Sequence, residues 1–142
     1  MIRLAQNAGI LAASCLSHFT TNEPLDLIIP VPLHPVREKE RGYNQSYHIA
    51  RGLFSQSGLP IHQNLLRRIR HTRSQTELNR EERRNNVDQA FQVVHDPEIK
   101  GKTIALIDDV VTTGATLNEC ARVLKLAGAR RVLGFTLSTP LD

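Results

Sequence analysis

The sequence contains no tryptophan, and its phenylalanine and tyrosine bring the aromatic content to only 4% of 142 residues. A core of large rings is therefore excluded, and the interior must rest on leucine, isoleucine, valine and alanine. Hydrophobic residues still make up 40% of the chain and charged residues 23%, the balance of a soluble globular protein rather than a disordered tail. The formal net charge of +4 permits an anionic ligand without specifying nucleic acid.

Cysteine is also scarce, because Cys15 and Cys120 stand far apart and form no CxxC pair. Neither a disulfide framework nor a zinc ribbon can be built from them, so we expect no zinc in this chain. The histidines are scattered along the sequence, which predicts no metal site made of side chains. This cysteine usage is compatible with a reducing cytoplasm, and we expect the protein to be cytoplasmic.

Long hydrophobic runs are missing, so no segment approaches the length that crosses a bilayer. Residues 8–16 are weakly apolar, but a single Arg precedes them and they hold no strong apolar block, which is poor signal-peptide chemistry. The apolar residues from Leu4 to Phe19 recur at roughly helical spacing. Residues 1–22 are therefore predicted to form a packed N-terminal helix.

The rest of the chain alternates strand-like and helix-like segments, which predicts an α/β domain with a mostly parallel, twisted sheet flanked by helices. Predicted strands span residues 25–31, 65–70, 90–94, 103–107 and 131–138, and predicted helices span residues 44–57 and 116–128. We expect one domain over residues 1–142, with its core in residues 25–139. A charged loop is expected at 33–45. A polar excursion at 70–89, between two short strands, is either a disordered insert or a functional flap.

Residues at the helix ends predict where the two helices begin and stop. Asn44 is a plausible N-cap for the first helix, and Gly58 with Pro60 stops it. In the second helix, Thr116 and Glu119 have the spacing of a capping box, and Gly128 is a C-cap signal.

The stretch at residues 104–116, IALIDDVVTTGAT, is the most informative part of the sequence. Four apolar residues end in two carboxylates, Asp108 and Asp109, at the carboxyl end of a predicted strand, where open α/β sheets bind ligands. A loop of Thr and Gly follows and opens into the second helix. Its backbone N–H groups and the positive end of the helix form a cradle for an anion.

The residue types in this stretch suit a sugar phosphate. Gly114 lets the backbone approach an oxyanion closely, and the hydroxyls of Thr112, Thr113 and Thr116 supply further donors. Two adjacent carboxylates repel a phosphate, but they suit a vicinal diol whose hydroxyls each donate to a charged acceptor. Phosphate and diol together describe a ribose 5-phosphate. The alternative is a solvated aspartate beside a strand-end cap.

This stretch resembles the phosphoribosyl pyrophosphate signature of type I phosphoribosyltransferases, which is a highly specific motif. The wider chain resembles the ComF family of competence-associated phosphoribosyltransferase-like proteins, through PVPLHPVREKERGYNQS, TRSQTELNREERRNNVDQAF and the signature itself. The resemblance covers about residues 25–139 and implies the type I phosphoribosyltransferase fold. ComF proteins commonly begin with a four-cysteine zinc module that this sequence lacks. The sequence is therefore either a short form or begins inside a longer protein.

The resemblance also implies roles for individual residues. Asp108 and Asp109 would bind the ribose hydroxyls and act in catalysis, and Arg73, at the position of the family's mobile flap, would assist them. The 5-phosphate would be bound by Thr112, Thr113, Gly114, Ala115 and Thr116. Pyrophosphate would be bound by Val31, Pro32, Arg37 and Arg41. For these last residues, a plain strand end and a solvated charged loop are the alternatives.

Two classes of function fit this resemblance. As an enzyme, the protein would bind Mg²⁺ with phosphoribosyl pyrophosphate and displace pyrophosphate with a nitrogen nucleophile, the metal being carried by the substrate. As a non-catalytic module, it would bind a nucleotide or ribose phosphate and assist DNA uptake or single-stranded DNA handling, with competence proteins as partners. The Arg-rich excursion favours the second class, whereas the shortage of aromatic residues argues against it. Either class is compatible with a homodimer.

Overall fold

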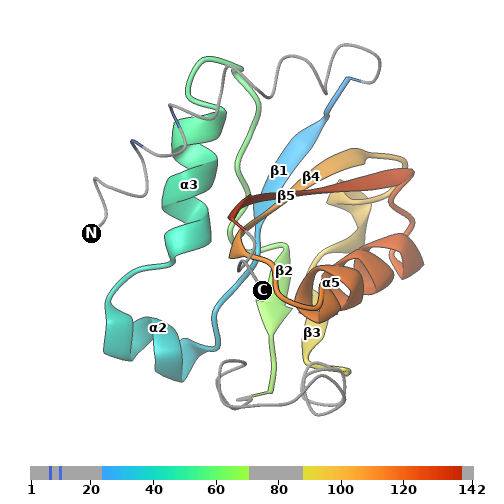
Figure 1. Ribbon diagram of the computed structural model, residues 1–142. Helices are drawn as coiled ribbons and strands as arrows, with labels where there is room; N and C mark the ends of the chain where they lie inside the picture. The colour runs from blue at the N-terminus through green and yellow to red at the C-terminus, as the bar shows by residue number, and fades with distance from the viewer. Residues whose placement is uncertain (1–6, 8–9, 11–23, 71–87, 139–142) are drawn as a thin grey trace.

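The computed structural model describes residues 7, 10, 24–70 and 88–138 (Figure 1). Its strands are β1 (Leu27–Pro30), β2 (Leu66–Arg68), β3 (Phe91–Val93), β4 (Thr103–Val110) and β5 (Arg131–Ser138). Its helices are α2 (Pro35–Arg41), α3 (Gln45–Leu53) and α5 (Ala115–Leu126), with a 3₁₀ turn at Asp96–Glu98. The predicted α/β architecture with helices flanking a parallel sheet is confirmed.

A parallel sheet in the order β1-β4-β5 forms the centre of the described fold. β4 lies in the middle, and its residues Thr103–Ile107 are all buried because both faces of the sheet are covered. Pairing with β5 continues past the predicted end of this strand, since Asp108 is paired with Thr136 and Val110 with Ser138. The two aspartates therefore belong to the strand itself, at its carboxyl end.

Alternate residues along the sheet point into two apolar layers on its opposite faces. One layer joins the sheet to α3 and contains Ile28, Ile49, Ala50, Leu53, Phe54, Ala105 and Ile107. The other layer joins the sheet to α5, β2 and β3, and includes Ile29, Leu66, Phe91, Ile104, Leu106, Cys120 and Leu124. Phenylalanine is the aromatic residue of both layers, which otherwise consist of aliphatic side chains and Cys120.

β2 and β3 form a separate antiparallel ribbon in which Leu66 is paired with Val93 and Arg68 with Phe91. Figure 1 places this ribbon beside α5, and Leu66 and Phe91 are buried in the same layer as α5. The two short strands predicted around a polar segment are thereby confirmed. The segment between them, residues 71–87, lies outside the described residues.

α3 begins where the sequence predicts and ends earlier. The backbone N–H of Ser46 donates to Oδ1 of Asn44 at 3.0 Å, which confirms the N-cap. The helix stops at Leu53, because the chain turns at Phe54 and the hydroxyl of Ser57 donates to the carbonyl of Phe54 at 2.9 Å. Such local side-chain bonds compete with helix continuation.

The charged loop predicted at 33–45 is wrong in its central part, where the residues form α2. Pro35 lies in the first turn, where its missing N–H is tolerated, and the N–H of Val36 donates to Nδ1 of His34 at 3.3 Å. Gly42, with a φ of 80°, ends the helix in the left-handed conformation. α2 buries none of its residues, so hydrophobic periodicity carried no signal for it.

The capping box predicted from Thr116 and Glu119 is wrong. α5 begins at Ala115, with Gly114 as its N-cap, and Glu119 lies further into the helix. The Glu119 carboxylate accepts a hydrogen bond from the backbone N–H of Gln89 instead. The predicted stop is confirmed, since Gly128 has a φ of 95° directly after the C-cap.

The predicted helix at residues 1–22 lies outside the described residues, apart from the isolated helical positions Asn7 and Ile10. Among the helices of residues 24–70 and 88–138, none combines the length and the apolar character that crossing a membrane requires.

We expect the two leucines near the end of α5 to differ sharply in their effect on stability. Leu124 is fully buried against the sheet, whereas Leu126 on the same helix is 75% exposed. Leu124→Ala should lower the free energy of unfolding by about 2–5 kcal/mol, because it leaves a cavity, and Leu126→Ala by less than about 0.5 kcal/mol. Urea denaturation of both variants checks this. Equal midpoints would contradict the packing of α5 on β4.

Candidate functional site

Four segments that are distant in the sequence meet at the carboxyl ends of the parallel strands and enclose a cleft of about 330 Å³. They come from the turn after β1, the stretch from the end of α2 into α3, the end of β2 and the stretch from β4 into α5. The lining residues are Val31, Pro32, Leu33, Arg41, Asn44, Gln45, Ser46, Arg68, Asp108, Asp109, Val110, Val111, Thr112, Gly114, Ala115, Thr116 and Leu117.

The two carboxylates lie side by side in this cleft, and each is held by a hydrogen bond from the backbone. Oδ1 of Asp108 accepts from the N–H of Asp109 at 2.9 Å and from the hydroxyl of Ser46 at 3.2 Å. Oδ1 of Asp109 accepts from the N–H of Val110 at 2.9 Å. One oxygen of each carboxylate is thus used to orient the side chain, and both side chains line the cleft.

Burial, and after it the adjacent charge of Asp109, are the main causes that raise the pKa of Asp108 to about 7. The hydrogen bonds from Ser46 and from the Asp109 backbone act in the opposite direction, because they stabilise the ionised form. Asp108 therefore changes charge close to neutral pH, which marks the acidic pair as a functional-site candidate.

The loop between β4 and α5 presents a donor-rich cradle to the same cleft. Gly114 adopts a φ of 76°, a left-handed conformation that residues with a side chain rarely take. The N–H of Ala115 donates to Oγ1 of Thr113 at 3.3 Å, and α5 starts there. The first turn of α5 thus opens onto the cleft, where the positive end of the helix dipole favours an anion.

The start of α3 closes the opposite side of the cleft through Asn44. Its Nδ2 donates to the carbonyl of Val31 at 3.0 Å, while its Oδ1 caps α3. One side chain thereby fixes the turn after β1 against the first turn of α3. The amino ends of two helices, α3 and α5, converge on a single cleft, and this arrangement is suited to a ligand with more than one anionic group.

Most of the predicted site residues meet in this cleft. Asp108, Asp109, Thr112, Gly114, Ala115, Thr116, Val31, Pro32 and Arg41 all line it. Thr113 does not line it, and its hydroxyl instead accepts the bond from Ala115. Arg37 lies on α2 and is not among the lining residues. Arg73 lies outside the described residues.

The cleft also contains residues that the sequence does not mark as binding a ribose phosphate or pyrophosphate, chiefly Ser46 and Arg68. Ser46 is buried and bonds to an aspartate that is 62 residues away in the sequence, so no local pattern reveals it. Arg68 stands in an Arg-rich run in which neighbouring arginines look alike. A period-2 pattern supplies a weak signal, because Leu66 and Arg68 share one face of β2 whereas Arg67 is exposed.

Comparison with known proteins adds a family and a fold to this geometry. Residues 39–137 match the family described as "Phosphoribosyl transferase domain". Competence protein F of Haemophilus influenzae is 38% identical over 108 residues, which are 75% of this chain and 47% of that protein. DNA utilization protein YhgH of Salmonella typhi is 33% identical over 133 residues, which are 93% of this chain and 58% of that protein. These matches confirm the resemblance to the ComF family, and the chain spans about half the length of these curated relatives.

A solved structure supports the same fold. Glutamine phosphoribosylpyrophosphate amidotransferase of B. subtilis, complexed with ADP and GMP, superposes with a TM-score of 0.60 at 22% identity, over 96% of this chain and 26% of that one. At that identity the likeness concerns the fold alone. The predicted type I phosphoribosyltransferase fold is confirmed.

The raised pKa of Asp108 predicts a pH-dependent stability. The usual pKa of an aspartate is 3.8. Between pH 3.8 and about pH 7, Asp108 in the folded protein retains a proton that it has released in the unfolded chain. The free energy of unfolding should therefore fall as the pH rises through that window, and this contribution should be lost above pH 7. Asp108→Asn should remove this part of the slope, as checked by urea denaturation from pH 4 to pH 8.

Asp109→Asn is the matched control, because it removes the neighbouring charge and leaves Asp108 in place. This variant should lower the pKa of Asp108. The pH range over which the free energy of unfolding falls should therefore become narrower but should not disappear. Identical slopes for the wild type and Asp108→Asn would contradict the burial of this carboxyl.

Proposed function

The chain belongs to the phosphoribosyl transferase domain family, and from this premise we propose that its cleft binds phosphoribosyl pyrophosphate and displaces pyrophosphate with a nitrogen acceptor. A nucleotide that carries a ribose 5-phosphate would occupy the same cleft as product. The observation that carries the proposal is the acidic strand end facing two helix amino ends within one cleft.

Each part of the ligand has a chemical counterpart in the cleft. The 5-phosphate would lie against the loop at residues 112–116, where backbone N–H groups and the dipole of α5 favour an anion. The ribose hydroxyls would donate to the carboxylates of Asp108 and Asp109, at roughly 1.5–3 kcal/mol for each charged hydrogen bond. Pyrophosphate would lie toward Val31, Pro32 and Arg41, which line the other side.

The same residues suit the charge that develops during transfer. As the bond from the anomeric carbon to pyrophosphate breaks, the ribose gains positive charge, and ionised carboxylates beside it stabilise that charge. An ionised Asp108 accepts from a hydroxyl more strongly than a protonated one, so affinity for the ribose should rise as the pH passes about 7. The proposal also includes binding of pyrophosphate by Arg37 and a catalytic role for Arg73.

Magnesium would enter the cleft with the pyrophosphate. Among the oxygen donors of the cleft, the carboxylates of Asp108 and Asp109 suit Mg²⁺, which also keeps water and substrate oxygens as ligands. When bound, the metal neutralises charge on the leaving group. The orientation of the ribose and the stabilisation of its charge fall to the residues of this chain.

A binding measurement tests the first half of the proposal. Phosphoribosyl pyrophosphate with Mg²⁺ should raise the melting temperature of the wild type and bind with a Kd measurable by calorimetry. Asp109→Asn should weaken binding by roughly 10- to 150-fold, equivalent to the loss of one charged hydrogen bond. Asp88→Asn, an exposed position that does not line the cleft, should bind within about twofold of the wild type.

A turnover measurement tests the second half. With a panel of nucleobases and amines as acceptors, the wild type should release pyrophosphate with at least one of them, and Asp109→Asn should release it at least about tenfold more slowly. Binding without release for any acceptor would refute the transferase role and leave a ligand-binding module.

That module is the second candidate function, and the names of the relatives favour it. Competence protein F and DNA utilization protein YhgH are named for DNA-related roles. In this version the cleft binds a nucleotide or ribose phosphate, and the protein assists DNA uptake or handles single-stranded DNA with competence proteins. For both the transferase and the ligand-binding module, the proposal includes a cytoplasmic location and assembly as a homodimer.

Substituting arginines that lie outside the cleft distinguishes DNA binding from ligand binding in the cleft. Arg67 and Arg70 are exposed on the ribbon, and neither lines the cleft. If the module binds single strands, Arg67→Ala with Arg70→Ala should weaken binding and flatten its salt dependence, whereas Asp109→Asn should leave it unchanged. Fluorescence anisotropy at several salt concentrations measures both. No binding at low salt would exclude this function for the chain.

A further inference from the structure

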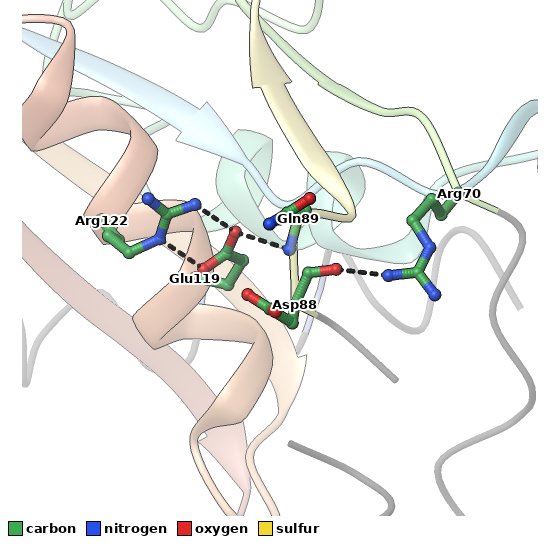
Figure 2. A network of polar contacts seen from close by, with 5 residues as sticks. All are labelled: Arg70, Asp88, Gln89, Glu119 and Arg122. Atoms are coloured by element: carbon green, nitrogen blue, oxygen red, sulfur yellow. Dashed lines mark hydrogen bonds and ion pairs between the residues drawn. The ribbon is translucent and has the colours of Figure 1, made fainter. Parts of the chain in front are cut away.

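A buried carboxylate outside the cleft anchors the β2–β3 ribbon to α5. Glu119 is only 7% exposed, and Figure 2 shows its two oxygens facing Arg122 and the backbone of Gln89. Nε and an Nη atom of Arg122 donate to the two oxygens at 2.7 Å each, and the N–H of Gln89 donates to Oε1 at 3.1 Å. We call this set of three residues the Glu119 anchor.

The anchor holds a backbone that would not adopt its conformation unaided. Gln89 has a φ of 53°, which residues other than glycine rarely take, so surrounding contacts must maintain it. Hydrogen bonds from Arg122 and from Gln89 lower the pKa of Glu119, although burial opposes them, and Arg122 has the largest effect. The carboxylate of Glu119 is therefore ionised at neutral pH.

From Gln89 the contacts continue across the ribbon to the cleft. The next residue, Ala90, accepts at its carbonyl from the N–H of Ile69 at 2.7 Å. A guanidinium N–H of Arg70 donates to the carbonyl of Asp88 at 2.6 Å, which joins the segment after β2 to the segment before β3 (Figure 2). These bonds fix the end of β2 against the start of β3.

Arg68, at the end of β2, is the residue that this arrangement presents to the cleft. It is paired with Phe91, and its guanidinium carbon lies 5.3 Å from the centre of that ring. The stacked guanidinium lines the cleft together with Asp108, whereas Arg67 on the other face of the strand is exposed. A stacked arginine presents a planar set of donors that matches phosphate oxygens.

We propose that Arg68 contacts the anionic oxygens of the ligand and that Glu119 is the positioning residue that holds Arg68 in the cleft. This inference rests on the proposed function and adds two residues to it. Burial lowers the pKa of the Arg68 guanidinium and the nearby Arg37 lowers it as well, while the carboxylate of Asp108 raises it. The side chain remains charged at neutral pH, because an arginine does not lose its proton in proteins.

The first experiment compares the two adjacent arginines of β2. Calorimetry of the full chain with Mg²⁺ and phosphoribosyl pyrophosphate should show Arg68→Ala binding roughly 10- to 150-fold more weakly than the wild type. Arg67→Ala, the matched control, should bind within about twofold. Equal affinities of Arg68→Ala and the wild type would overturn the inference. Should Arg68→Ala fail to fold by urea denaturation, Arg68→Lys replaces it and should still weaken binding, because it loses the planar donor set.

The second experiment tests whether Glu119 acts through Arg68. Glu119→Ala should weaken binding roughly tenfold, and Glu119→Gln, which keeps an oxygen acceptor for Gln89, should weaken it less. The double variant Glu119→Ala with Arg68→Ala should bind no more weakly than Arg68→Ala alone, because the positioning residue has nothing left to position. Additive losses would mean that Glu119 merely stabilises the fold, and would overturn its positioning role.

The inference and the proposed function can fail separately. If the wild type does not bind phosphoribosyl pyrophosphate, the proposed function fails, and inorganic pyrophosphate with Mg²⁺ becomes the probe for the arginine. Loss of pyrophosphate binding in Arg68→Ala but not in Arg67→Ala would still support the inference. If the wild type binds neither ligand, both proposals are overturned.

Discussion

The burial of two neighbouring carboxylates at the end of a central strand is the constraint on which this site depends. Such groups are costly in a half-buried position unless hydrogen bonds and positive potential compensate them. The fold supplies both, through the hydroxyl of Ser46, two backbone N–H groups and the amino ends of α3 and α5. The compensation is incomplete, since the pKa of Asp108 still rises to about 7. A ligand whose hydroxyl groups donate to the two carboxylates would complete it.

The sequence predicted those parts of the structure whose signals are local. An apolar run that ends in Asp108 and Asp109 indicates a buried strand reaching a sheet edge, and the sheet has it there. Gly114 and Gly128 occupy left-handed positions that favour glycine. Asn44 caps α3 through a bond to Ser46, two residues away. In each case a few adjacent residues determine the backbone, so the sequence alone is sufficient.

The features that the sequence missed depend on residues that meet only after folding. Glu119 has capping-box spacing from Thr116, yet it bonds to Gln89, which reaches it from another part of the chain. α2 buries no side chain, so its formation depends on end signals at His34 and Gly42 rather than on periodicity. Arg68 differs from Arg67 only in the face of β2 to which it belongs. Assigning that face requires the register with β3.

The cleft is assembled from positions as far apart as Val31 and Leu117, so it exists only when nearly the whole described fold is in place. A compound that fills it binds the native state and not the unfolded chain, and by mass action each tenfold excess over its Kd adds about 1.4 kcal/mol to the apparent stability. In a cell, the concentration of such a compound would then affect how long the protein survives proteolysis as well as what fraction of it is occupied.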